Sequence, residues 1–405
     1  MNIHKQRAAQ FPLGASLTLA QLEADVHPIL HQLRMAEPVS WVPVLDAWLV
    51  TRYDDCIAVM RDAKTYTVDH PGFSTGQVVG PSMLSLDGTQ HLRHRTPFER
   101  PFRKREVETR FNASVTAQVA ELIDGFVDDG QAELRRDFAG PVAVKAMITA
   151  LGMDDTPVED VLGWYDLIVD AVTRVSAGEP VSNEGRAAFA ALGDSLMPAL
   201  HGLPDTSQPE SSLLAAAAGM ADGLGDEQII SNAAVLLFGG IETTEGMIAN
   251  ALHYLLSDPA LLQSVRANPA MIPAVVEESL RMEPAASVVD RYTTVDVELR
   301  GASIKAGDLV RVSLVGANRD PMVFDTPDVF NPQRPNLRSH VAFAQGPHVC
   351  LGLHLARLEA QDALCQALKR LPNLRLQRTE EARHAAQPQG LIFRKSPALH
   401  AIWDR

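Results

Sequence analysis

A single thiol stands between two glycines at the start of a helical segment, in residues 343–352, which read Phe-Ala-Gln-Gly-Pro-His-Val-Cys-Leu-Gly. After Cys350 the apolar residues recur every three, four or seven positions until Pro372, which predicts an amphipathic helix ending there. Unpaired backbone N–H groups and the helix dipole favour a thiolate at such a position. We therefore expect a lowered pKa for the Cys350 thiol.

The flanks of this thiol favour a binding loop over a packing position. Gly346 and Gly352 carry no side chains, which would let a flat macrocycle approach the backbone closely. The competing interpretation is a buried core cysteine, the usual fate of a free cysteine. Glycines, an imidazole and a helix start within one loop favour an iron-binding thiolate instead.

The other cysteines do not add ligands to this loop. The chain has three cysteines and no C-x-x-C pair, so the sequence supports neither a disulfide framework nor a zinc or iron–sulfur site. Cys56 and Cys365 lie in segments with apolar periodicity. We expect both to pack in the core.

The whole pattern, F-x-x-G-x-H-x-C-x-G-x-x-L-A, resembles the heme-binding loop of the cytochrome P450 family. Its fixed positions are Phe343, Gly346, His348, Cys350, Gly352, Leu355 and Ala356. The resemblance implies heme b as the cofactor, with its iron bound by the sulfur of Cys350 and the loop against the ring. Further motifs in the family's order begin at residue 91, so the resemblance covers essentially the whole chain.

Residues 229–256 form an apolar helical run that contains Gly239-Gly240-Ile241-Glu242-Thr243-Thr244. Two glycines inside a helix cost about 1 kcal/mol each relative to alanine, so we expect them to open a groove beside a cofactor. An ionised Glu242 is costly to bury without a partner, and Thr243 can bond to a carbonyl one turn earlier and loosen the helix. The alternative is a helix end at which Glu242 is solvated.

The same segment resembles the family's oxygen-activation motif, small-Gly-x-acid-Thr. The resemblance implies that Thr243 holds dioxygen and a water, while Glu242 relays protons. Splitting dioxygen requires two protons on one oxygen atom, and a hydroxyl beside a carboxylate can supply them through water. Glu242 and Thr243 are the predicted catalytic residues, with Glu at a position where many members carry Asp.

Glu278 and Arg281 lie three positions apart on one predicted helix face, which by itself indicates a weak surface ion pair. The spacing resembles the family's E-x-x-R motif, and Arg334 in Phe-Asn-Pro-Gln-Arg matches its third member. The resemblance implies a buried network that serves folding and heme retention rather than chemistry.

A basic stretch between residues 91 and 105 runs against the net charge of −14. A solvated helix face explains its outward-pointing members equally well. The resemblance implies four residues that bind the heme propionates, namely His91, Arg95, Arg291 and His348. Arginine suits carboxylates through its rigid fork of donors. Docking of an acidic redox protein is the other function that the stretch supports.

The remaining pattern predicts a mainly α fold with a smaller β-rich portion, the cytochrome P450 fold. A chain of 405 residues with 46% hydrophobic content can bury a large core, and no linker divides it, so we predict a single domain over residues 1–405. Helical spacing dominates from about residue 91 to residue 255. Strict alternation at 295–299 and 310–314 predicts strands.

Shorter signals fill in the local structure. Two apolar segments around a Leu45-Asp46-Ala47 turn predict a hairpin, and residues 53–62 return to helical spacing. Many glycines and prolines in 66–86 predict one long loop, and the polar residues of 204–211 predict an exposed loop.

Charge and the N-terminal sequence limit the partners and the location. The net charge of −14 argues against nucleic acid or an anionic membrane as a general partner. The first seven residues are polar and lack the apolar run of a signal peptide or membrane anchor. We predict a cytoplasmic protein.

Together the motifs predict a heme-thiolate monooxygenase that activates dioxygen and hydroxylates or O-dealkylates a small lipophilic substrate. The sequence has no flavin motif and no iron–sulfur cysteines, so a ferredoxin or a flavin/iron–sulfur reductase must supply electrons. Residues 390–405 are similar to the heme domains of self-sufficient members fused to such a reductase.

Other functions stay open at this point. A peroxide-driven peroxygenase is disfavoured by Glu242 and Thr243, because a dedicated peroxide user does not need this proton relay. A heme sensor or carrier without turnover, and a structural protein with no cofactor, are the remaining alternatives.

The resemblance also indicates the walls of a substrate pocket. Besides the 73–86 loop, the predicted walls are chiefly apolar and uncharged, namely Val235, Leu236, Gly239, Val288, Val289, Leu391 and Ile392. Such a lining favours a lipophilic small molecule without identifying it.

Overall fold

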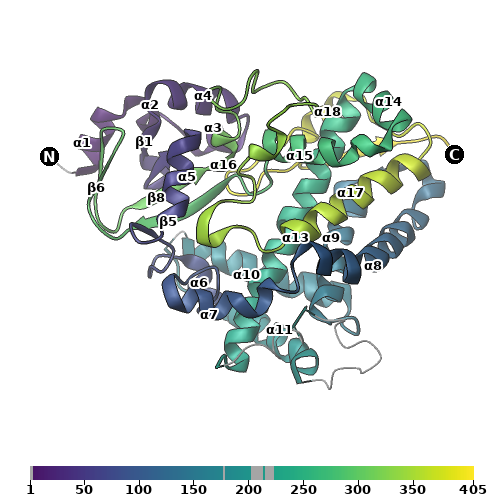
Figure 1. The fold of residues 1–405 in the computed structure, drawn as a ribbon, viewed down its shortest axis with the longest axis horizontal. Coiled ribbons are helices and arrows are strands. Elements are labelled where there is room, and N and C mark those ends of the chain that lie inside the picture. The colour runs from purple at the N-terminus through teal and green to yellow at the C-terminus, as the bar shows by residue number, and fades with distance from the viewer. Residues whose placement is uncertain (1–2, 177, 202–212, 215–222) are drawn as a thin grey trace.

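The computed structural model describes residues 3–176, 178–201, 213–214 and 223–405. The loop expected at 204–211 lies outside these residues. Helices dominate the structure, and a smaller β-rich portion lies beside the N-terminal helices at the upper left of Figure 1. This arrangement confirms the predicted mainly α fold. None of the described helices is both long and apolar enough to cross a membrane.

The β-rich portion is built on a five-stranded sheet with the order β1-β2-β8-β5-β3. Its strands are β1 (Val39–Val42), β2 (Ala47–Val50), β8 (Leu309–Ser313), β5 (Val288–Thr293) and β3 (Tyr66–Thr67). A separate hairpin of β6 (Val297–Leu299) and β7 (Ala302–Ile304) adjoins it in sequence. The strands expected near 295–299 and 310–314 are confirmed, each with slightly shifted ends.

The predicted N-terminal hairpin is also confirmed. β1 and β2 pair antiparallel with Trp41 opposite Trp48, and the two indole rings meet edge to face at 5.4 Å. Asp46 closes the turn in the left-handed region, with φ of 47°, a conformation that aspartate tolerates better than most residues. Both strands are buried throughout, so the hairpin forms part of a core although β1 lies at the edge of the sheet.

The prediction of one uninterrupted loop over 66–86 is wrong. β3 pairs with β5 at the start of this segment, and a short helix, α6 (Ser74–Val79), occupies its middle. Two valines of α6 are buried and the helix packs against α10, so tertiary burial outweighs the helix-breaking glycine at position 76. Only the remainder of the segment is irregular.

The large helices form the rest of the molecule. The long ones are α7 (Gly88–Glu99), α8 (Lys104–Asp124), α9 (Gly140–Leu151), α10 (Val158–Ser176), α11 (Asn183–His201), α13 (Asp226–Ser257), α15 (Ile272–Met282) and α17 (Leu353–Arg370). The shorter ones are α1 (Ile3–Gln10), α2 (Pro12–Ala15), α3 (Leu19–Glu23), α4 (His27–Ala36), α5 (Tyr53–Arg61), α14 (Pro259–Ala267), α16 (Leu314–Ala317) and α18 (Glu380–Ala385). A small sheet joins β4 (Gln131–Glu133), β10 (His400–Ile402) and β9 (Arg375–Leu376).

α13 runs through the centre of the helical portion and contacts α9, α15 and α17, while α17 also lies along α8 (Figure 1). The helix expected after Cys350 is therefore confirmed as α17, which ends just before Pro372 as predicted. The buried face of α17 includes alanines at 360, 363 and 367, and not the face on which Cys365 lies. Cys365 is consequently exposed, and its assignment as a packing residue is wrong, whereas Cys56 is buried as expected.

Candidate active site

The thiol loop is held by backbone contacts on the N-terminal side of Cys350. The N–H of Cys350 donates to the carbonyl of Phe343 at 2.8 Å, which closes the loop immediately before α17. Gly346 has φ of +75°, and a Cβ there would lie 2.5 Å from the carbonyl oxygen of Met60 in α5. Position 346 therefore requires glycine, both for its backbone conformation and for the close approach of α5. A Cβ at Gly352 would meet only the ring of Phe102, at 3.9 Å.

Burial raises the pKa of the Cys350 thiol, although backbone N–H groups of Gly352 and Leu353 act in the opposite direction. The expected lowering of this pKa is therefore wrong, because the cost of burying a charge outweighs the donors at the start of α17. A metal ion binds the thiolate and displaces the proton of the thiol. A raised pKa in the metal-free protein is therefore compatible with Cys350 as a metal ligand.

Four predicted propionate-binding residues come together around this loop, from α7, β5 and the loop itself. The rings of His91 and His348 lie 4.4 Å apart, and Arg95 donates to the carbonyl of Val349 at 2.8 Å. Arg291 is 4% exposed and its positive charge lowers the pKa of His348, after the larger effect of burial. The cluster is a buried set of donors, which is what bound carboxylates need.

His91 is the least satisfied member of this cluster. Its Nε2 atom is buried and has no hydrogen-bond partner among the described residues. Burial, with the nearby His348 and Arg95, lowers the pKa of His91 to about 4, so its ring is neutral near pH 7. A neutral imidazole with one unpaired nitrogen can donate to an incoming oxygen atom.

Asp87, which sequence reasoning missed, organises the cluster from the loop before α7. Its Oδ1 lies 2.8 Å from Nε2 of His348, and its Oδ2 accepts from the Thr67 hydroxyl and the Val68 N–H. Burial acts to raise the pKa of Asp87, but these hydrogen bonds outweigh it and hold the pKa at about 2. An acid followed by glycine ahead of a helix resembles any helix start, so its role carries no separate sequence signal.

The two glycines of α13 serve different neighbours. Gly239 is exposed on this core helix, and a Cβ there would meet no other described group within 4 Å. A Cβ at Gly240 would collide with the sulfur of Met147 in α9, so this glycine permits close helix packing. Gly239 therefore leaves open space, as expected for a groove. The expectation that Gly240 also opens a groove is wrong.

Glu242 lies in the middle of α13, so the alternative of a solvated helix end is excluded. Its Oε2 accepts a hydrogen bond from the hydroxyl of Tyr165 at 2.5 Å, and its Oε1 lies 2.7 Å from Nζ of Lys395. Thr243 donates its hydroxyl to the carbonyl of Gly239 within the same helix, as its sequence position predicts. The carboxylate and the hydroxyl thus bond to different groups.

The structural residues Glu278, Arg281 and Arg334 are buried and in contact. Two nitrogens of Arg281 donate to the two carboxylate oxygens of Glu278, each at 2.8 Å, and Nε of Arg334 donates to Oε1 at 3.2 Å. The N–H of Asn331 adds a fourth donor at 2.9 Å. A buried carboxylate with two guanidinium partners fits a structural role.

Nocardicin C N-oxygenase of Nocardia uniformis subsp. tsuyamanensis is 33% identical over 413 residues, which cover 97% of this chain and 98% of that protein. A family profile described as Cytochrome P450 matches residues 205–401, and Cytochrome P450 monooxygenase PikC of Streptomyces venezuelae is 32% identical over 94% of this chain and 90% of that protein. The chain belongs to the cytochrome P450 family. Mycinamicin IV hydroxylase/epoxidase of Micromonospora griseorubida is 33% identical, over 92% of this chain and 94% of that protein.

Solved structures agree with this assignment. The myxobacterial cytochrome P450 CYP267B1, solved in complex with myristic acid, superposes with a TM-score of 0.81 at 29% identity. The match covers 96% of this chain and 99% of that one. This P450 is thus a monooxygenase of a family whose members bind heme b.

The residues of this P450 fit heme b. Cys350 precedes α17, and the neighbouring α13 carries Gly239 with open space in place of a side chain. The buried, unpartnered Nε2 of His91 and the guanidinium groups of Arg95 and Arg291 suit the two carboxylates of the cofactor. Donor chemistry and space therefore agree with the cofactor that the family implies.

The predicted pocket walls of this P450 come from segments that lie side by side. The N–H of Ser287 donates to the carbonyl of Ile392 at 2.9 Å, and Ala286 forms an isolated β-bridge with Phe393. This pairing brings Val288 and Val289 next to Leu391 and Ile392. On α13, Val235 is buried and Leu236 is partly buried.

Two of these wall residues face the N-terminal helices of this P450. Val288 and Leu391 line a small apolar cavity together with Leu22, Val26 and Leu30. Ile392 is 44% exposed, and Val289 packs against the core of the β-rich portion. The predicted wall residues therefore do not all face one space.

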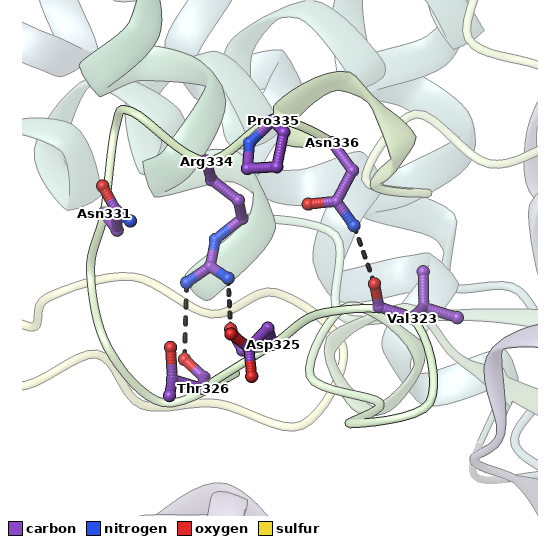
Figure 2. Close-up of a pocket in the computed structure, with 7 residues that line it drawn as sticks. All are labelled: Val323, Asp325, Thr326, Asn331, Arg334, Pro335 and Asn336. Carbon is purple, nitrogen blue, oxygen red and sulfur yellow. Dashed lines mark hydrogen bonds between the residues drawn. The ribbon is translucent and has the colours of Figure 1, made fainter.

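A larger cavity of about 370 Å³ in this P450 lies beside the structural residues (Figure 2). It is lined by Val323, Asp325, Thr326, Asn331, Arg334, Pro335 and Asn336. Arg334 donates to the carbonyls of Asp325 and Thr326, and Asn336 donates to the carbonyl of Val323 at 2.7 Å. Because its polar groups bond to one another and no predicted pocket wall lines it, this cavity belongs to the structural network.

Substituting Gly239 with leucine tests the open space on α13. We expect the variant to retain heme but to bind imidazole, a small ligand of heme iron, about tenfold more weakly, since that factor corresponds to 1.4 kcal/mol of steric cost. The measurement is an absorbance titration with imidazole. Gly163→Leu is the matched control, because Gly163 is exposed on α10 and a Cβ there also meets nothing within 4 Å. Unchanged imidazole affinity in Gly239→Leu would contradict the assignment.

Proposed function

We propose that this P450 holds heme b through the thiolate of Cys350 and inserts one oxygen atom of dioxygen into a small lipophilic substrate. The balanced reaction consumes R–H, O₂, two electrons and two protons, and yields R–OH and water. O-dealkylation follows the same balance, because the hydroxylated ether carbon is a hemiacetal that then splits into an alcohol and a carbonyl compound. The observation that carries the proposal is a half-buried thiol immediately before α17, a helix that packs against α13 with its Gly239, Glu242 and Thr243.

Each group of residues has a separate task. When bound, the heme supplies the oxygen chemistry, and thiolate ligation promotes cleavage of the O–O bond. Cys350 holds the iron, and the backbone N–H groups of Gly352 and Leu353 stabilise charge on its sulfur. His91, Arg95, Arg291 and His348 bind and orient the cofactor's carboxylates, with Asp87 fixing the ring of His348.

Proton handling falls to α13. The Thr243 hydroxyl presently donates to the carbonyl of Gly239, one turn away, and can instead hold a proton or water in the space beside that glycine. Glu242 is the adjacent carboxylate that replenishes the proton through water. Both residues lie on a helix that is fixed by its neighbours, so the groups keep their positions between turnovers.

Apolar residues on α13 and the names of the relatives support this substrate class. Val235 and Leu236 of α13 contribute hydrocarbon surface and no charge. Among the relatives, one is named for nocardicin C and another for mycinamicin IV, while a structural neighbour holds myristic acid. The apolar residues and the myristic acid complex favour a lipophilic natural product or fatty acid as the substrate.

Electrons come from a ferredoxin or a flavin/iron–sulfur reductase, which we place with this P450 in the cytoplasm. The exposed basic residues Arg100, Arg103, Lys104 and Arg105 adjoin Phe102, whose ring lies near Gly352 of the thiol loop. A positive surface next to the iron ligand suits an acidic electron donor, which it would attract at low ionic strength.

The proposal is tested by reconstituting the heme-loaded protein with NADPH, a ferredoxin and its reductase. A panel of fatty acids and macrolide-type compounds is supplied under ¹⁸O₂, and products are analysed by mass spectrometry. We expect a product that carries one ¹⁸O atom and depends on NADPH. Oxygen in the product that derives from water, or product formation that needs only added peroxide, would overturn the monooxygenase proposal.

Removing the Thr243 hydroxyl tests the proton relay. In Thr243→Ala we expect NADPH oxidation to continue while the fraction that ends in product falls about tenfold or more, because a positioned proton donor typically contributes that much. Hydrogen peroxide should account for the difference, and both are measured in the same reaction. Thr243→Ser keeps the hydroxyl and should restore most of the yield; equal yields in parent and alanine variant would remove Thr243 from the relay.

A further inference from the structure

Glu242 is held by side chains from outside its own helix. Tyr165 of α10 donates to its Oε2 at 2.5 Å, and Lys395, from the segment after the predicted pocket walls, lies 2.7 Å from its Oε1. The same Lys395 ammonium also contacts Glu245, one turn along α13. Glu245 is bound in turn by Arg135, at 3.2 Å, from the π-helical turn Arg135–Ala139.

The charges in this network are balanced and shielded from solvent. Two carboxylates face two cations, and the exposed fractions of Lys395, Glu242, Glu245 and Arg135 are 16%, 20%, 12% and 15%. Partly buried charges interact more strongly than surface pairs, and loss of one member leaves its partner uncompensated. Each carboxylate orientation is therefore set by its partners.

The two partners of Glu242 differ in what they fix. Burial raises the pKa of Tyr165 and the charge of Glu242 raises it further, so the phenol stays protonated and only donates to the carboxylate. The backbone of Lys395 exchanges hydrogen bonds with Gln389, at 3.0 and 3.2 Å, which closes the segment 389–395 into a hairpin-like loop. Gly246 of α13 lies against this loop: a Cβ there would be in van der Waals contact with Cβ of Lys395, at 3.4 Å, and would clash with Cβ of Ala285, at 2.8 Å.

The geometry points to Lys395 and Tyr165 as positioning residues that fix the carboxylate of Glu242, and so make proton delivery depend on the 389–395 loop. Neighbouring residues on a helix point about 100° apart, so Glu242 is not directed at Thr243 by α13 alone. Its partners decide where the carboxylate lies. Lys395 closes the 389–395 loop, so a ligand that displaces this loop also displaces the partner of Glu242. The inference rests on the proposed function of Glu242 in the relay.

The first experiment measures the coupling of NADPH oxidation to product in the reconstituted, heme-loaded protein. Lys395→Met keeps the length of the side chain and removes its charge, Tyr165→Phe removes only the hydroxyl, and Lys395→Arg keeps the charge. We expect the first two to lower coupling about tenfold, as for loss of a charge-assisted hydrogen bond, and to increase the solvent deuterium isotope effect. Lys395→Arg should retain most of the coupling.

The second readout does not depend on turnover. Amide hydrogen exchange of residues 389–396 in the resting protein should become about tenfold faster in Lys395→Met, because the loop loses its ionic anchor to α13. Lys305→Met is the matched control: Lys305 pairs with Asp296 at the same distance of 2.7 Å but is exposed in the β-rich portion. It should leave coupling and exchange of the 389–396 segment unchanged.

The outcomes separate the two proposals. If the parent protein forms no NADPH-dependent product, the proposed function fails. If the parent forms product and Lys395→Met and Tyr165→Phe match it in coupling and isotope effect, the positioning role is overturned. A loss of coupling in Lys395→Met that Lys395→Arg does not rescue would also overturn it, because the effect would then be one of packing.

Discussion

Replacing Cys350 with histidine will shift the Soret band of the reduced, carbon-monoxide-bound protein from a strongly red-shifted position to that of histidine-ligated heme. An anionic thiolate donates more electron density to iron than a neutral imidazole does, which is the basis of both the spectrum and O–O bond cleavage. We expect NADPH-dependent product formation to fall below detection. Absorption spectra and the ¹⁸O₂ assay measure the two effects.

Cys365→His is the control for this experiment. Cys365 lies on the same helix-forming segment but is exposed, so the same substitution there should leave both the spectrum and the turnover as in the parent. A red-shifted band that persists in Cys350→His would show that another group binds the iron. The absence of heme from the parent protein would contradict the central proposal.

The second large effect concerns stability. Arg281→Met leaves the fully buried carboxylate of Glu278 with Arg334 as its only side-chain cation among the described residues, and breaking a buried pair in this way costs about 3–5 kcal/mol of unfolding free energy. We expect a corresponding loss at equilibrium in urea titrations of the heme-loaded protein. Heme content after purification should fall with it, because Asn331 and Arg334 of the same network support the segment that leads into the thiol loop.

The same substitution at the surface gives the comparison. Arg375 pairs with Asp404 at 3.0 Å, but both side chains are about half exposed, so Arg375→Met should cost less than about 1 kcal/mol. Equal losses in the two variants would mean that the buried network contributes no more than an exposed ion pair. Its assignment as a structural network would then be wrong.

The sequence allows much of the fold to be predicted where the signal is local. The helix after Cys350, the hairpin around Asp46 and the central helix each depend on spacing within a short segment. Cys365 was misplaced because the buried face of α17 is formed largely by alanines, whose small side chains carry a weak hydrophobic signal. The helix within 66–86 depends on burial against α10, which spacing does not reveal.

In the candidate site, too, the residues in local motifs could be predicted from the sequence, and their distant partners could not. Cys350, Glu242 and Thr243 stand in motifs whose meaning is contained in adjacent residues. Asp87, the partner of His348, and Lys395, the partner of Glu242, do not, because each comes from a distant part of the chain and looks in the sequence like an ordinary surface charge. The direction of the Cys350 pKa was predicted wrongly for a related reason: the degree of burial is a property of the folded chain.

The five-stranded sheet has a consequence for how the protein is made. β2 pairs in parallel with β8, with Trp48 opposite Val310, so the strands of one sheet leave the ribosome far apart in time. Until the later strand emerges, the apolar N-terminal hairpin exposes an unpaired edge on a nascent chain, where such edges favour association with other chains. Pairing across so much sequence also slows folding. Slow expression at low temperature and access to chaperones should therefore favour the yield of folded protein.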